Sequence, residues 1–298
     1  MKATSPYNDP DVPILSRPPQ RVVSLVPSVT ESLFDLDLGS RLIGRTDYCI
    51  YPAGQVERIP TLGGTKNPDI QRIIELQPDL VILNREENRR QDAEALQAAG
   101  ISTWATHPRT VQDALNLLWD MMSLFDHPKM VARVRLIEYT FDWVQGVSLA
   151  REDEPTKVFV PIWLDPLMTF NADTYIHDLL RVCGGTNVFA HRERLYPLAA
   201  DLGQKEAWPE DDPRLRGRDV RYPRVTWEEV VAHQPDVILL PSEPYTFSEA
   251  DLPLFERLDV PAARNGRIHL VDGSLLTWHG TRLAYALEAL PKLIHTAE

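Results

Sequence analysis

The sequence predicts an α/β protein made of two similar, Rossmann-like lobes with parallel sheets. The main observation is a repeat, because residues 77–83 and 234–240 both begin Gln-Pro-Asp and continue with branched apolar residues. An apolar segment precedes each copy. This pattern is typical of a helix, a tight turn and a strand that is buried on both faces of a parallel sheet. Two such segments far apart in one chain indicate two lobes, and two lobes imply a ligand cleft between them.

The length, composition and net charge of the chain argue against several functional classes. The 298 residues are enough for two domains, each with its own core. With 31 basic and 43 acidic residues the net charge is −12, which does not favour binding to nucleic acid or to anionic lipid. No apolar run is long enough to span a membrane. Cys49 and Cys183, one in each predicted lobe, are interpreted as free thiols.

The composition along the chain divides it into four parts. Residues 1–20 form an irregular, proline-rich lead-in, and residues 21–125 form the N-terminal lobe. Residues 126–150 form a connecting helix, and residues 151–298 form the C-terminal lobe with an insertion at 191–224. Because residues 1–20 lack the apolar core of a signal peptide, we expect a cytoplasmic protein, or a periplasmic or extracellular one if a leader has been removed.

In the N-terminal lobe, residues 21–26 predict a strand that leads directly into a helix. Ser28 and Glu31 have the spacing of a capping box, and Gly39 is the expected end of this helix. Further strands are expected at residues 42–44, 80–83 and 101–105, with a helix over residues 91–99. Two loops interrupt this pattern, one with two tyrosines at residues 46–52 and one with paired glycines at residues 62–68.

The connecting helix has apolar residues spaced by threes and fours, which predicts one buried stripe. The stripe consists of Val131, Val134, Ile137, Phe141, Val144 and Val147. In the C-terminal lobe, strands are expected at residues 157–163, 237–240 and 267–271, and a helix through Tyr175 ends at Gly184. Residues 226–229 should cap the helix before the second Gln-Pro-Asp turn. The insertion has no clear period and is interpreted as a surface loop or as a flap over the cleft.

No catalytic motif is present, and no histidine is paired with another His or Cys at metal-ligand spacing. The loops after the predicted strands instead carry aromatic and soft apolar residues from both lobes: Tyr48, Tyr51, Trp163, Met168, Tyr245, Phe247 and Trp278. Such residues suit a bulky, flat, partly apolar ligand held by a few polar contacts. His279 follows Trp278 and is either a packed histidine or a residue of the cleft.

Several segments, taken in order, resemble the helical-backbone (class III) substrate-binding proteins of cobalamin and iron-chelate ABC importers. They are residues 21–31, the Tyr48 to Pro52 loop, the Gly63-Gly64 loop, residues 77–81, residues 183–187 and residues 226–236. The resemblance covers nearly the whole chain from Arg21. The tyrosine loop and the glycine loop are most similar to the cobalamin-binding branch.

The resemblance implies a non-enzymatic protein that holds a corrinoid or another metal chelate between two lobes joined by a stiff helix. No intrinsic cofactor is implied, because the metal arrives inside the ligand, and His279 is a possible axial ligand to it. The residues expected to contact the ligand are Pro27, Ser28, Tyr48, Tyr51, Gly63, Gly64, Thr65, Arg85, Trp163, Met168, Tyr245, Phe247, Trp278 and His279.

The family also implies a carboxylate on each lobe that docks to an ABC permease. Glu228 stands at one of these positions, whereas Gln71 stands where the other carboxylate is expected. Docking to a permease is therefore left open. The first alternative is an iron-siderophore or haem binding protein, which basic residues such as Arg85 and Arg282 facing an anionic chelate would favour. The second is a cytoplasmic corrinoid-handling factor or enzyme without a permease, for which the chain shows no acid, base or nucleophile pair.

Overall fold

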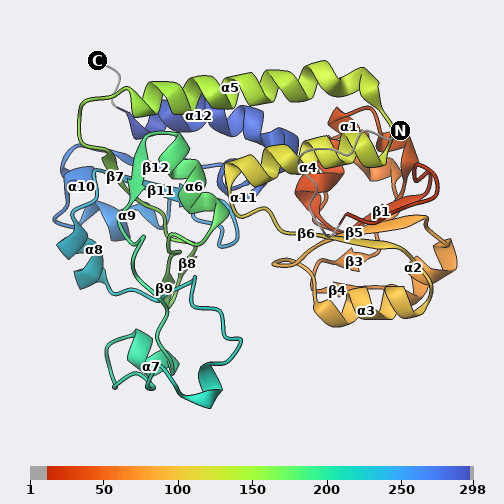
Figure 1. Cartoon of the computed structure of the whole chain (residues 1–298). Coiled ribbons are helices and arrows are strands. Elements are labelled where there is room, and N and C mark those ends of the chain that lie inside the picture. The colour runs from red at the N-terminus through yellow and green to blue at the C-terminus, as the bar shows by residue number, and fades with distance from the viewer. Residues whose placement is uncertain (1–11, 296–298) are drawn as a thin grey trace. The chain divides into compact units, whose positions relative to one another are not determined.

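The computed structural model describes residues 12–295, so residues 1–11 of the predicted lead-in lie outside the described residues (Figure 1). Residues 12–20 have no helix or strand, as expected. The described chain divides into two compact units: unit 1 comprises residues 12–140 and 278–284, and unit 2 comprises residues 141–277 and 285–295. The sequence assigns residues 278–284 to the C-terminal lobe, but the structure groups them with unit 1.

Unit 1 is built on a four-stranded parallel sheet in the order β2-β1-β5-β6. Its strands are β1 (Val22–Ser24), β2 (Leu42–Arg45), β5 (Leu80–Asn84) and β6 (Thr103–Thr106). A hairpin of two-residue strands, β3 (Gly63–Gly64) and β4 (Asn67–Pro68), lies between β2 and β5 in the chain. The helices are α1 (Pro27–Asp35), α2 (Ile70–Leu76), α3 (Arg90–Ala98) and α4 (Val111–Leu124). Figure 1 shows α2 and α3 on one face of the sheet and α1 and α4 on the other.

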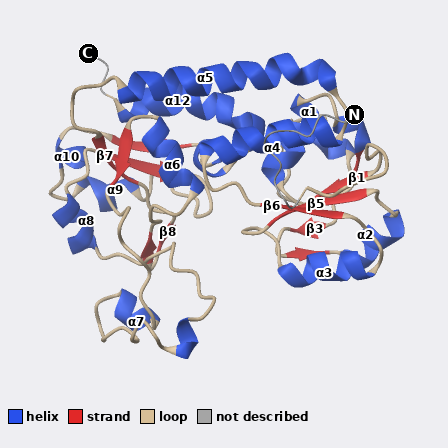
Figure 2. Ribbon diagram, in the orientation of Figure 1, coloured by secondary structure: helices blue, strands red, loops and turns tan. Residues whose placement is uncertain are grey.

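Unit 2 repeats this plan with a parallel sheet in the order β10-β7-β11-β12. Its strands are β7 (Thr156–Phe159), β10 (Gly185–Asn187), β11 (Val237–Pro241) and β12 (Ile268–Val271), with a hairpin of β8 (Trp163–Leu164) and β9 (Leu167–Met168). The helices are α6 (Tyr175–Val182), α7 (Leu198–Asp201), α8 (Trp227–His233), α9 (Leu252–Glu256), α10 (Pro261–Arg264), α11 (Ser274–Thr277) and α12 (Leu283–Ile294). The two sheets share one strand order. When the four strands of each sheet are numbered along the chain, their order across the sheet is second, first, third, fourth. The predicted α/β fold with parallel sheets is confirmed (Figure 2).

The two Gln-Pro-Asp turns have the same structure. Gln77 and Gln234 end their helices in the left-handed conformation, with φ of 49° and 47°. Asp79 then accepts hydrogen bonds from the backbone N–H groups of Gln20 and Arg21, and Asp236 accepts one from Lys157 N–H at 2.9 Å. Each Asp therefore ties the start of the third strand of its unit to the start of the first.

Several local predictions are wrong. Ser28 and Glu31 do not form a capping box, because Pro27 already occupies the first turn of α1 and the N-cap residue is Val26. The helix ends at Asp35, before Gly39. In contrast, Thr226 and Glu229 form the predicted capping box at the start of α8. Helix α4 was not predicted.

Helix α5 (Val131–Leu149) is the predicted long helix, and it begins a few residues after the predicted start. Val134, Ile137 and Phe141 are buried as expected, whereas Val147 is exposed. The reason is geometric. Two successive steps of three residues from Phe141 rotate the side chain back by about 120°, away from the buried face, because a helix has 3.6 residues per turn.

The insertion at residues 191–224 is organised around one buried carboxylate. Asp201 forms an ion pair with Arg192 at 3.2 Å and accepts the backbone N–H groups of Leu195 and Arg224. Figure 2 shows α7 within this loop-rich segment, beyond the β8–β9 hairpin of unit 2. An isolated bridge between Met168 and Arg224 joins the end of the insertion to that hairpin.

No helix in the described part of the chain is long and apolar enough to cross a membrane.

Candidate functional site

The candidate site in unit 1 lies at the carboxyl ends of β1 and β5. These two strands are neighbours in the sheet, and the chain order reverses between them, which is where open α/β sheets bind ligands. Strand β1 leads to Ser28 on α1, and β5 ends at Asn84. The returning segment 278–284 is held at this point by a hydrogen bond from Thr281 N–H to Ser32 Oγ at 3.0 Å. Gly280 permits this approach, since an added Cβ would lie 2.2 Å from Ser32 Oγ.

His279 is buried between Ser28 and Asn84, with 3.3 Å from Nδ1 to Ser28 Oγ and 3.3 Å from Nε2 to Asn84 Nδ2. Asn84 Oδ1 accepts the N–H groups of Glu86 and Glu87, so its amide nitrogen faces the ring and donates to Nε2. The neutral ring therefore carries its proton on Nδ1 and donates it to Ser28. Burial lowers the pKa of His279 to about 4, with a smaller raising effect from the Glu86 carboxylate.

This geometry does not favour His279 as an axial metal ligand. Both ring nitrogens already have polar partners, and Nε2, the unprotonated one, accepts from Asn84. A metal bound at Nε2 would have to displace the Asn84 amide, which would leave that buried donor without its acceptor. The role of His279 as an axial ligand remains a prediction. In the structure, His279 is a neutral histidine that joins Ser28 after β1 to Asn84 at the end of β5.

Asn88, which the sequence did not single out, connects three parts of the unit 1 site. Its side-chain amide donates to Leu25 O after β1 and to Thr65 O in the glycine hairpin, at 3.3 and 2.9 Å. Its carbonyl oxygen accepts Asn84 N–H at 2.7 Å. The predicted ligand residue Thr65 thus contributes a backbone carbonyl to the framework. No sequence motif identifies Asn88. The only local indication of its role was its position four residues after the end of a strand.

Tyr48 and Gly64 lie against each other, as a shared ligand surface requires. A Cβ on Gly64 would lie 3.3 Å from the Tyr48 ring and 2.6 Å from Asn67 Oδ1, so glycine is needed for this approach. Gly63 has a φ of 85°, and an added Cβ would clash with the Asn67 backbone oxygen. Tyr48 is 62% exposed. The paired glycines therefore serve the hairpin itself and leave the Tyr48 ring at the surface.

Arg45, a second residue that the sequence analysis missed, holds the tyrosine loop in place. Its buried guanidinium donates to four backbone carbonyls, those of Thr46, Cys49, Val56 and Ile59, at 2.9 to 3.1 Å. An arginine at the end of a buried strand was the available signal. The buried Cys49 thiol in the same loop is free, as predicted, and burial raises its pKa. Cys183 is likewise buried and free.

Tyr51 and Trp278 meet in unit 1, packed edge to face with ring centroids 5.7 Å apart. The Arg282 guanidinium lies over Tyr51 at 4.3 Å and forms an ion pair with Glu31 at 2.8 Å. Trp278 is buried and Tyr51 half-buried. This cluster uses the charge of Arg282 within the protein, which weakens the expectation that it faces an anionic chelate.

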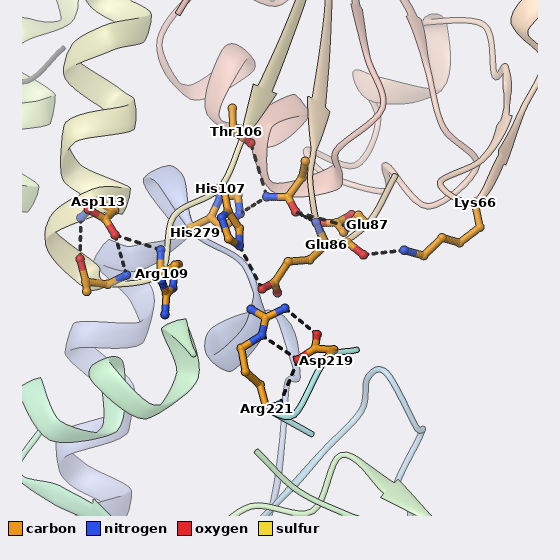
Figure 3. Close-up of polar contacts among 12 residues, drawn as sticks. Lys66, Glu86, Glu87, Thr106, His107, Arg109, Asp113, Asp219, Arg221 and His279 are labelled. Atoms are coloured by element: carbon orange, nitrogen blue, oxygen red, sulfur yellow. Dashed lines mark hydrogen bonds and ion pairs between the residues drawn. The ribbon is translucent and has the colours of Figure 1, made fainter. Parts of the chain in front are cut away.

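Charged residues border the unit 1 site at the ends of β5 and β6. His107 Nε2 lies 3.4 Å from the Glu86 carboxylate, and Lys66 donates to the Glu86 backbone oxygen (Figure 3). Arg85 is exposed, and its backbone N–H donates to Thr106 O. Pro27 is buried in the first turn of α1. Of the polar residues predicted in this unit, Arg85 is therefore on the surface and Ser28 is not.

In unit 2 the predicted aromatic residues form a row from the surface to the core. Trp163 is 43% exposed and packs edge to face on the half-buried Tyr245, with centroids 5.6 Å apart. Tyr245 contacts Phe247, which is buried in the unit 2 core. Met168 pairs with Trp163 across the β8–β9 hairpin and is half-buried. Trp163, Met168 and Tyr245 form a surface, whereas Phe247 lies beneath it and supports Tyr245.

The two predicted docking positions are structurally equivalent. Gln71 is the second residue of α2, and Glu228 is the second residue of α8; each helix has seven residues and ends at a left-handed glutamine. Both side chains are exposed. The Glu228 pKa is lowered chiefly by backbone N–H groups at the start of α8. The Gln71 amide donates to Glu75 at 3.1 Å.

Among the described residues no three or more His, Cys, Asp or Glu side chains gather in a way that could hold a metal ion.

The sequence matches the model of the periplasmic binding protein family over residues 22–274. The chain belongs to this family. The family description offers no support for the expected cytoplasmic location. A vitamin B12-binding protein of Vibrio parahaemolyticus is 25% identical to this chain over 255 residues, which are 85% of this chain and 81% of that protein.

Solved structures of periplasmic binding proteins have the same fold. The vitamin B12 binding protein BtuF of Vibrio cholerae gives a TM-score of 0.71 at 19% identity, over 93% of this chain and 97% of that one. The haem-binding protein HutB of Vibrio cholerae gives 0.70 at 18% identity, over 93% and 99% of the two chains. The predicted resemblance to cobalamin and iron-chelate binding proteins is confirmed.

Proposed function

We propose that this protein binds a corrinoid without chemically changing it. The observation that carries the proposal is the pair of supported aromatic surfaces at the carboxyl ends of the strands: Tyr48 beside Gly64 in unit 1, and Trp163 on Tyr245 in unit 2. Exposed aromatic side chains on rigid supports suit a large, flat, partly apolar ligand. The names of the curated relatives favour a corrinoid among such ligands.

The polar groups near the unit 1 surface also favour a ligand without strong negative charge. His279 is neutral at pH 7, and Arg282 is engaged by Glu31. A siderophore or haem would need cationic partners for its anionic groups. Of the predicted residues in this unit Arg85 is an exposed cation, and the neighbouring exposed Lys66 already donates to the Glu86 backbone oxygen. An enzyme acting on the chelate would need a positioned acid, base or nucleophile. The buried His279, with both ring nitrogens engaged, is poorly suited to that role.

The test is to titrate the purified protein with cyanocobalamin, hydroxocobalamin, haemin and a ferric siderophore, using calorimetry and visible spectra. We expect binding of both corrinoids and weakening by about 10- to 100-fold in Tyr48→Ala and in Trp163→Ala, which is the usual cost of removing an aromatic contact residue. Leu149→Ala, a change at another exposed residue, should leave binding unaltered. Binding of haemin or the siderophore with no response to either corrinoid would reject the proposal.

The axial role of His279 is tested by the same spectra. Unchanged hydroxocobalamin spectra in His279→Gln would agree with the hydrogen-bonded position of the ring. A protein-dependent spectral shift that this substitution abolishes would instead establish axial ligation and require Asn84 to move.

We infer that the protein delivers its ligand to an ABC permease outside the cytoplasm, in keeping with the description of its family. Glu228 is the exposed carboxylate that would dock to the permease in unit 2, whereas Gln71 offers only an amide at the equivalent position. Glu228→Gln should therefore reduce ligand uptake by cells while leaving ligand affinity intact. Gln71→Glu should raise uptake. If neither substitution changes uptake, docking through these two residues is rejected.

A further inference from the structure

Helix α5 carries large apolar side chains on a face that the described part of the chain leaves exposed. Leu136, Tyr139, Trp143 and Val147 are between 48% and 73% exposed. Their spacing of three, four and four residues places them along one side of the helix. We call these four residues the α5 stripe. Soluble proteins expose single apolar residues routinely, but a contiguous row of this size marks an interaction surface.

The α5 stripe is separate from the face of the helix that packs on the protein. The buried residues Val134, Ile137 and Phe141 lie on a different side of the helix, at least about 80° round its axis from each stripe residue. Helix α5 is therefore apolar on two faces, and its own fold accounts for only one of them. A helix that serves only as a connector needs one apolar face and a polar one.

We propose that the α5 stripe binds the same stripe of a second copy of this chain, with the two helices antiparallel across a twofold axis. The arrangement of the stripe is self-complementary. Reversing the helix about its middle brings Leu136 opposite Val147 and Tyr139 opposite Trp143, so each aromatic residue meets the other aromatic residue of the partner copy. A twofold contact requires this exchange, because residue i must meet residue j while j meets i.

The charges at the two ends of α5 also match in this arrangement. The exposed Lys129 lies at the start of the helix, near Arg133, which forms an ion pair with Asp35 at 3.1 Å. The exposed run Glu152, Asp153 and Glu154 follows the end of the helix and outweighs Arg151. An antiparallel pair places the basic start of one helix beside the acidic end of the other. A parallel pair would set like charges together.

The size of the stripe predicts a dimer of modest strength. With about 150–250 Å² for each aromatic side chain, the α5 stripe of one copy offers about 500 Å² at its observed exposure. Two copies would bury about 1,000 Å², close to the lower limit for a specific interface. We therefore expect a dissociation constant in the micromolar range, about 1 to 50 µM.

The first test is sedimentation velocity of the full chain at concentrations from about 1 to 200 µM, which bracket that range. The wild-type protein should pass from monomer to dimer, and Trp143→Asp should weaken association by about 30-fold or more, as expected for a central aromatic residue. The matched control is Leu149→Asp. Leu149 is as exposed as Trp143 but lies about 120° round the helix, off the stripe, so dimerisation should be unchanged.

The second test identifies the geometry. A mixture of Leu136→Cys and Val147→Cys proteins should form a disulfide between the two variants faster than either protein forms one with itself. The native cysteines are buried and are expected to give little background. A monomer at every concentration, or association that Leu149→Asp disrupts and Trp143→Asp does not, would overturn the proposal. Equal self- and cross-linking of the two cysteine variants would exclude the antiparallel register. The outcome does not depend on which ligand the protein binds.

Discussion

The burial of His279 predicts a specific loss of stability in acid. Its pKa falls from an ordinary value of 6.5 to about 4 because burial disfavours the charged ring. Between these pH values the unfolded chain binds a proton that the folded chain does not. The contribution of His279 to stability is therefore complete above pH 6.5 and is lost as the pH falls towards 4. At about 1.4 kcal/mol for each pH unit between the two values, the loss amounts to about 3 kcal/mol.

His279→Gln is the decisive substitution, because glutamine can donate to Ser28 and accept from Asn84 but does not titrate. At pH 7.5 the variant should be less stable than wild type, by an amount that reflects lost packing. The difference should shrink by about 3 kcal/mol between pH 7.5 and pH 4, as the wild type loses the contribution of its histidine. Urea titrations at fixed ionic strength, at half-unit steps of pH, give the free energy of unfolding for both proteins.

The comparison between the two proteins removes the effect of other groups. Half-buried histidines such as His177 also have a lowered pKa through burial, but they are present in both proteins and cancel. Ser28→Ala is a second control, since it removes the acceptor of the ring N–H and should cost about 1 to 3 kcal/mol while the acid sensitivity persists. A difference between wild type and His279→Gln that stays constant from pH 7.5 to pH 4 would refute the reasoning.

Three further predictions follow from individual contacts. Gln77→Gly should stabilise the protein by about 0.5–1 kcal/mol in thermal unfolding, because glycine adopts the φ of 49° found at residue 77 more readily than glutamine does. Gln234→Gly should give no gain in stability, because the Gln234 side chain donates to two backbone carbonyls that would lose this donor. Asn88→Ala should cost about 2–3 kcal/mol in urea unfolding, since it leaves buried backbone groups without partners. Phe247→Ala should lower the free energy of unfolding by about 3–5 kcal/mol, because Phe247 is buried in the unit 2 core. Trp163→Ala should lower it by less than about 1 kcal/mol and should weaken ligand binding instead. Equal losses of stability in the two variants would contradict this difference in burial.

The repeat explains why the fold could be predicted. A strand buried on both faces must be a continuous apolar run, and a helix that stops abruptly needs a residue that tolerates positive φ followed by proline. Both requirements act within about ten residues, so they are visible in the sequence at each Gln-Pro-Asp turn. The structure adds what the repeat cannot show alone: Asp79 and Asp236 each accept a backbone N–H group at the start of the first strand of their own sheet, from Arg21 and Lys157.

The parts of the site that could not be predicted depend on distant partners. Ser28 has the local pattern of a helix cap, yet its hydroxyl contacts His279, 251 residues away in the chain. Nothing near residue 28 specifies that partner. Phe247 and Trp163 illustrate the same limit, because both are aromatic residues after a strand, and only the packing of α9 beneath Phe247 makes one of them core and leaves the other at the surface.

The supports beneath Tyr48 are the strongest reason to regard its exposure as functional. An exposed aromatic residue on a loose loop would lose conformational freedom when a ligand binds, and that loss would reduce the affinity. Arg45 fixes the Tyr48 loop through four backbone carbonyls, and Asn88 fixes the neighbouring glycine hairpin to the ends of β1 and β5. The backbone around the ring is therefore ordered before any ligand arrives. This order around an exposed ring supports the proposal that Tyr48 contacts the ligand.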